Sequence, residues 1–104
     1  MAQITAKESP EMDALVEAFL ALKDRGECYA FLRDLCTMKE LSDMSQRLQA
    51  AKMLLQGKTY EQIVKEGGIS TATISRINYC VQYGSGGYRT IIGRLEGAEG
   101  PAEK

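Results

Sequence analysis

Apolar residues recur at helical spacing along most of the chain, and each apolar series is bounded by residues that favour a helix end. The first series follows Ser9, with Pro10 at the first helical position, and Gly26 is expected to close this helix. A second one-sided apolar series lies within residues 27–36. No strand pattern competes with these series. The pattern therefore predicts an all-α fold.

Capping residues mark the helices that follow. Thr37 begins a capping-box pattern before a long helix that runs to Leu55, and Thr59 begins a second such pattern. Ser70 is expected to cap the next helix. A last short helix spans residues 88–95. About six helices are thus predicted.

The domain boundaries follow from the same pattern. One helical domain is expected over residues 9–95, between a flexible N-terminus at 1–8 and a flexible acidic tail at 96–104. No apolar run is long enough to span a bilayer, and the N-terminus lacks the order of a signal peptide. A cytoplasmic location without membrane contact is expected.

Residues 59–80 carry the most informative functional pattern. They predict two short helices separated by a Gly67-Gly68 turn, and Ile63 and Val64 of the first are expected to face inward. The second helix has small side chains at its front and an arginine one turn later. A helix-turn-helix that binds the DNA major groove is built in this way. The pattern predicts a transcriptional regulator, most simply a repressor.

Small residues at the front of the second helix would let it approach the base edges of double-stranded DNA. Nearby lysines would contact phosphates, although Lys52 and Lys65 are equally well explained as solvated side chains. The residues expected to contact DNA are Lys58, Gln62, Ser70, Thr71, Ala72, Thr73, Ser75 and Arg76.

Charge and composition refine this picture. The net charge is −1, but residues 37–94 hold eight Lys or Arg against four Asp or Glu, a local charge of +4 that coincides with the helix-turn-helix. The chain has no histidine, and its three cysteines form no Cys-x-x-Cys pair. A catalytic role, a metal site and a cofactor are therefore not expected.

The first two helices carry more apolar residues than one chain of this length can readily cover. Such a surplus normally contacts a partner, and two-fold symmetry is the commonest arrangement. A homodimer is expected. An alternative function is a helix-turn-helix that serves as a protein-interaction module, with an acidic N-terminal third that docks a partner and no specific DNA binding.

The order of these residues resembles the Trp repressor family, and within it the YerC/YecD-type subgroup. The shared features are Thr37 before a long helix, Gln46-Arg47 in its middle, Gly57 after its end, and the run from Gly68 to Arg76. The resemblance covers about residues 10–95. It implies six helices that interlock between two chains, with tryptophan bound beside the second helix of the helix-turn-helix.

The effector pocket that the resemblance implies is matched only in part. Thr37, Arg47 and Arg76 match positions beside the indole ring, stacked on it, and at the carboxylate. Ile77 stands where the family has a glycine that leaves room for the indole, and Cys80 stands where it has a serine. Tryptophan binding is therefore not expected.

Three explanations of this departure remain open. Ile77 can fill the slot with the protein's own side chain, so that no ligand is needed. Arg47 and Arg76 can instead bind a smaller anionic effector. Alternatively these arginines only bind phosphates or form ion pairs, such as one between Arg47 and Asp43.

Overall fold

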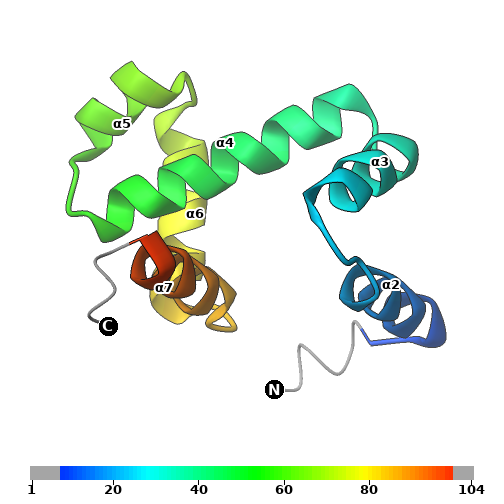
Figure 1. Cartoon of the computed structure of the whole chain (residues 1–104). Helices are drawn as coiled ribbons and strands as arrows, with labels where there is room; N and C mark the ends of the chain where they lie inside the picture. The colour runs from blue at the N-terminus through cyan, green and yellow to red at the C-terminus, as the bar shows by residue number, and fades with distance from the viewer. Residues whose placement is uncertain (1–7, 100–104) are drawn as a thin grey trace. The chain divides into compact units, whose positions relative to one another are not determined.

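The computed structural model describes residues 8–99, which form six α-helices and no strand (Figure 1). The helices are α2 (Pro10–Leu20), α3 (Arg25–Leu35), α4 (Met38–Leu55), α5 (Tyr60–Gly67), α6 (Thr71–Tyr83) and α7 (Gly87–Glu99). The predicted all-α class and the number of helices are confirmed. Among the described residues, no helix combines the length and apolarity that crossing a membrane requires. The N-terminal segment expected at 1–8 lies, apart from its last residue, outside the described residues.

Polar side chains begin the helices at the predicted positions. The Ser9 Oγ accepts a hydrogen bond from the Met12 N–H at 3.0 Å. At the start of α4, the Thr37 Oγ1 accepts from the Glu40 N–H at 3.0 Å, and the Glu40 carboxylate accepts from the Thr37 N–H at 2.8 Å. Each bond satisfies a backbone donor that the first turn of a helix leaves free.

The expected role of Gly26 was wrong, because α2 ends at Leu20 and Gly26 lies inside α3. The physical reason is a polar start signal that comes before the glycine. The Asp24 carboxylate accepts from the Glu27 N–H at 2.9 Å, and the Glu27 carboxylate accepts from the Lys23 N–H at 2.9 Å. With Asp24 as its cap, a new helix starts at Arg25, so the glycine occupies its first turn.

The chain divides after Leu41 into two compact units. In the first unit, neither α2 nor α3 contains a buried residue. The rings of Phe19 and Phe31 meet edge to face, with centroids 5.4 Å apart. The large apolar side chains that remain exposed on these two helices are Met12, Val16, Phe19, Leu20, Tyr29 and Leu35.

The second unit has a buried apolar core to which α4, α5, α6 and α7 all contribute. In Figure 1, α5 and α7 lie on opposite sides of the C-terminal half of α4, and α6 crosses it. The buried residues are Ala50, Ala51, Met53, Ile63, Ile74, Ile77, Val81 and Ile92. This core fixes one face of α5 and of α6, and so it also determines which face of each helix meets solvent.

The last helix is longer than expected, since α7 continues past Leu95 to Glu99. Its first turn is attached to α6 by Arg89, whose Nε donates to the carbonyl oxygen of Val81 at 2.9 Å. Residues 96–99 of the expected tail are therefore helical. Residues 100–104 lie outside the described part of the chain.

Candidate nucleic-acid interface

The turn between α5 and α6 is set by one glycine and one serine. Gly68 ends α5 with φ of 70° and ψ of 22°, a left-handed conformation that glycine adopts without steric cost. The Ser70 Oγ then caps α6 by accepting from the Thr73 N–H at 3.2 Å. Because Ile63 of α5 and Ile74 of α6 are both fully buried, the two helices share one core. The result is a helix-turn-helix at the predicted place.

The start of α6 presents small polar side chains to solvent. Thr71, Ala72 and Ser75 are exposed, and Arg76 is exposed on the next part of the same surface. Thr73 is only half-buried, and its Oγ1 accepts from the Ser70 Oγ at 3.0 Å. Six of the eight predicted DNA-contacting residues thus lie together on α6 or at its cap.

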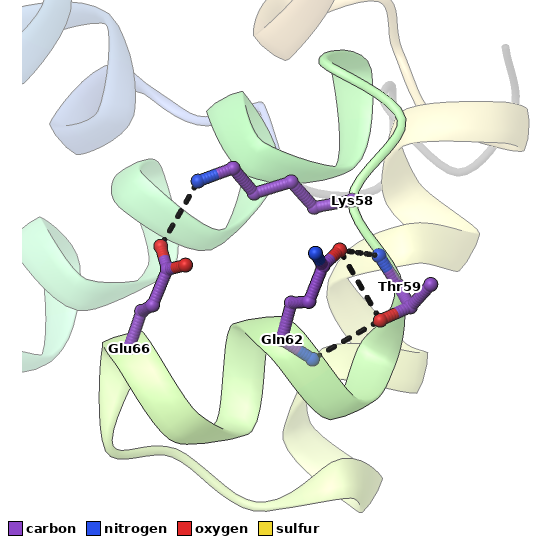
Figure 2. A network of polar contacts seen from close by, with 4 residues as sticks. All are labelled: Lys58, Thr59, Gln62 and Glu66. Carbon is purple, nitrogen blue, oxygen red and sulfur yellow. Dashed lines mark hydrogen bonds and ion pairs between the residues drawn. The ribbon is translucent and has the colours of Figure 1, made fainter.

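Of the other two predicted residues, Lys58 precedes α5 and Gln62 lies in its first turn, and both already have partners in the protein (Figure 2). The Lys58 Nζ forms an ion pair with the Glu66 carboxylate at 3.0 Å. The Gln62 Oε1 accepts from the Thr59 N–H at 2.8 Å, and the Thr59 Oγ1 accepts from the Gln62 N–H at 3.1 Å. These bonds form the second predicted capping box, which fixes the first turn of α5.

A hollow of about 760 Å3 lies between the outer face of α5 and the first residue of α6. The residues that line this α5–α6 hollow are Tyr60, Glu61, Gln62, Val64, Lys65 and Thr71. Val64 is 38% exposed here, so its predicted inward position was wrong. Consecutive helical residues point about 100° apart, and Ile63 takes the central core position, which leaves Val64 at the edge.

Sequence reasoning did not identify Tyr60, Glu61 and Val64 as parts of a surface feature. Tyr60 and Val64 are four residues apart, as are Glu61 and Lys65, and such pairs share one side of a helix. That spacing was visible in the sequence. The contribution of Thr71 was not, because it depends on the turn that brings α6 beside α5.

A second cavity, of about 780 Å3, lies between α4 and α6. Of the predicted effector-pocket residues, Arg47, Arg76, Ile77 and Cys80 line it. Thr37 belongs to the first unit, where its hydroxyl caps α4. Four of the five residues that the resemblance implies are thus brought together.

The walls of this α4–α6 cavity differ in chemical character. Arg47 and Arg76 supply two guanidinium groups, which suit a carboxylate or a phosphate, while Asp43 adds one carboxylate. Ile77 is only 3% exposed and belongs to the apolar core, so it forms an apolar wall. The arrangement can accept a small anion.

Tyr88 completes the cavity with a neutral phenol. Burial raises the pKa of Tyr88 above its ordinary value of 10.0, and the nearby Cys80 adds to the rise, while the positive charge of Arg47 partly offsets it. The hydroxyl therefore keeps its proton at neutral pH and can donate a hydrogen bond. Within residues 8–99, no cluster of three His, Cys, Asp or Glu side chains could hold a metal ion.

Comparison with known proteins agrees with this geometry. Residues 10–96 match the family described as Trp repressor protein. The chain is 44% identical over 97 residues to the "Uncharacterized protein YerC" of Bacillus subtilis (strain 168), an alignment that covers 93% of each protein.

Two solved structures have a similar fold. A "putative Trp repressor" from Staphylococcus aureus has 47% sequence identity and a TM-score of 0.84, over 89% of this chain and 93% of that one. A "TrpR like protein" from Eubacterium eligens ATCC 27750 has 42% identity and a TM-score of 0.83, over 88% of this chain and 94% of that one. From the length of the match and the shared fold, the chain belongs to the Trp repressor protein family.

Proposed function

We propose that this protein is a sequence-specific DNA-binding transcriptional regulator, most simply a repressor, that acts as a homodimer. The observation that carries the proposal is the exposed front of α6, where Thr71, Ala72 and Ser75 leave room for close approach to DNA. Ile74 and Ile77 hold the opposite face of the same helix in the core. This is how a recognition helix is mounted for the major groove.

The proposed contacts divide into two kinds. The hydroxyl and methyl groups of Thr71, Ala72 and Ser75 contact base edges, where methyl groups suit thymine and hydroxyls suit several bases. Arg76 and Lys58 contact phosphates, which supply affinity and orientation but little sequence choice. Lys58 must then exchange Glu66 for a phosphate oxygen.

The proposed dimer follows from the first unit, where α2 and α3 bury no residue and expose six large apolar side chains. A second copy that covers this surface would place two recognition helices on one duplex. These helices must lie ~34–36 Å apart to enter successive major grooves, so the preferred site is two-fold symmetric.

We also infer that DNA binding does not depend on tryptophan. Ile77, which stands where the resemblance implies a glycine, is almost fully buried against the α4–α6 cavity. By the resemblance, its branched side chain would stand in the place of the indole ring. A smaller anion held by Arg47 and Arg76 remains the alternative effector.

The experiment that tests the function is selection from a random duplex pool by the purified protein, with no ligand added, followed by sequencing. We expect an enriched palindrome whose affinity falls steeply with salt and does not change when tryptophan is added. Binding without enrichment would indicate a missing small-molecule effector. Absence of binding at low salt would support the protein-interaction module instead.

A substitution on α6 tests whether this helix contacts the DNA. Ala72→Glu places a carboxylate at the exposed front of α6, and we expect at least a tenfold loss of affinity for the selected duplex, from repulsion by phosphates and loss of close approach. The matched control is Thr90→Glu on the exposed face of α7. Fluorescence anisotropy measures both variants, and equal affinities would show that α6 is not the recognition helix.

A further inference from the structure

The α5–α6 hollow opens beside the residue that begins the recognition helix. Thr71 lines the hollow and also belongs to the exposed front of α6, so a duplex bound by α6 would face the hollow as well. Most of its lining is uncharged, with Tyr60 and Val64 as walls and Lys65 as the single cation. The hollow is therefore suited to a base edge more than to a phosphate.

One carboxylate, that of Glu61, also lines this hollow. The structure gives it no hydrogen bond and no ion pair with any residue in 8–99. Other glutamates differ, since Glu66 pairs with Lys58 and Glu40 caps α4. The Glu61 oxygens are thus free to accept hydrogen bonds from a ligand.

A carboxylate placed against DNA is selective because it can only accept hydrogen bonds. In the major groove, guanine presents two acceptors and thymine an acceptor beside a methyl group, and both would be repelled or unmatched. Adenine offers a donor with an acceptor next to it. Cytosine offers the N4 amino group as a donor and no acceptor, so it is the best match.

We propose that Glu61 is a specificity-determining residue that accepts a hydrogen bond from the N4 amino group of one cytosine in each half-site. The inference rests on the proposed function, because it requires α6 to lie in the major groove. Lys65, one turn further along α5, offsets the repulsion between the carboxylate and the phosphate backbone.

A purely structural role for Glu61 makes a different prediction. An acid in the first turn of a helix interacts favourably with the helix dipole, and Glu61 occupies the first turn of α5. Replacement by glutamine would then lower stability slightly and leave the choice of base unchanged. The effect on the selected sequence separates the two roles.

The test is duplex selection with Glu61→Gln alongside the wild type. The amide of glutamine matches adenine, which pairs a donor with an acceptor. We expect the wild type to select cytosine at one position in each half-site, the variant to select adenine there, and all other positions to stay the same. Glu61→Ala should lose the preference at that position without gaining another.

Glu66→Gln is the matched control, because it makes the same chemical change on the same helix outside the hollow. Glu66→Gln should still select cytosine at that position of each half-site. If Glu61→Gln melts like the wild type and still selects the wild-type sequence, the role of Glu61 is overturned while the proposed function stands. A wild type that enriches no sequence overturns the proposed function and this role together.

Discussion

Lys58 and Glu66 show how a single ion pair can influence the strength of DNA binding. Their side chains are 35% and 49% exposed and lie 3.0 Å apart, so water screens the pair and it contributes little to stability, about 0–1 kcal/mol. In the proposed DNA complex, the same carboxylate would compete with phosphate for the Lys58 ammonium group. The attraction that must be given up for DNA binding is therefore of the same small size as the contribution of the pair to the fold.

Removal of that competitor should strengthen DNA binding. We expect Glu66→Gln to raise affinity by about two- to fivefold, since up to about 1 kcal/mol of competing attraction is lost. The slope of log affinity against log salt should steepen by up to about one for each subunit, because Lys58 then contacts phosphate in every complex and not only in those that have broken the pair with Glu66. Fluorescence anisotropy across a salt series measures both quantities.

The control repeats the Glu66→Gln substitution in a protein that also carries Lys58→Met. In that protein Glu66→Gln should not steepen the slope of log affinity against log salt, because the lysine that would contact phosphate is gone. A steeper slope in both backgrounds would assign the effect to general charge and not to Lys58.

At the scale of single elements, the stability of α5 depends on the residues at its two ends. Isolated helices shorter than ~12–15 residues are marginal in water, and α5 has only 8. It is held by the Thr59 and Gln62 capping box at one end, by Gly68 at the other, and by Ile63 in the core. Since the α5–α6 hollow lies on this helix, its shape depends on those restraints.

The capping box gives a stability prediction. Thr59→Ala leaves the Gln62 N–H and the Gln62 Oε1 without their hydroxyl partner, and we expect the free energy of unfolding to fall by about 0.5–2 kcal/mol. Urea denaturation at fixed protein concentration measures the change. Thr90→Ala on exposed α7 serves as the control and should be neutral or slightly stabilising, because alanine favours helix interiors. A loss no greater than that of the control would contradict the role of the cap.

Local signals explain why the elements were largely predictable. Ser9, Thr37, Thr59 and Ser70 each accept a hydrogen bond from the backbone N–H three residues ahead, so a few consecutive residues decide each helix start. The prediction that Gly26 ends a helix failed because glycine is also tolerated in the first turn of a helix when a stronger cap precedes it. Residue type alone does not show which of two nearby signals prevails.

At the scale of the whole molecule, the two units differ in how far they can stabilise themselves. The second unit has a core of eight buried apolar residues, whereas α2 and α3 of the first have none. Folding of these two helices would leave large apolar side chains in water. Cover by a second copy is the simplest way to make their folding favourable.

The proposed dimer therefore predicts unfolding that depends on protein concentration. Each tenfold increase in concentration should add about 1.4 kcal/mol to the apparent free energy of unfolding of a dimer and raise the thermal midpoint. Phe19→Glu should weaken this dependence or abolish folding, since it places a charge on the apolar surface of α2. Sedimentation and thermal melts over a hundredfold concentration range measure both effects.

Tyr83→Glu is the matched control. Tyr83 is also an exposed aromatic residue that contacts another ring, in this case that of Tyr79, but it lies on α6 in the second unit. The unfolding of Tyr83→Glu should depend on protein concentration as strongly as that of the wild type. A midpoint that does not move with concentration for the wild type would contradict the dimer.

Features that join distant segments were predicted less well than helices. The α4–α6 cavity was anticipated from family positions, and four of its five expected residues line it, while the fifth, Thr37, belongs to the first unit and completes a local cap. The α5–α6 hollow was not anticipated at all. It exists only because the Gly68 turn sets α6 beside α5, and the sequence pattern of one helix does not report its neighbour.

A dimer formed through the exposed apolar side chains of α2 and α3, as proposed, would have a genetic consequence. A chain that pairs through these helices does so whether or not its own recognition helix is intact. Equal synthesis of intact and damaged chains would therefore leave only about a quarter of the dimers with two working copies of α6. Damage to the recognition helix would be dominant in a cell with both alleles, whereas damage to α2 or α3, which prevents pairing, would be recessive.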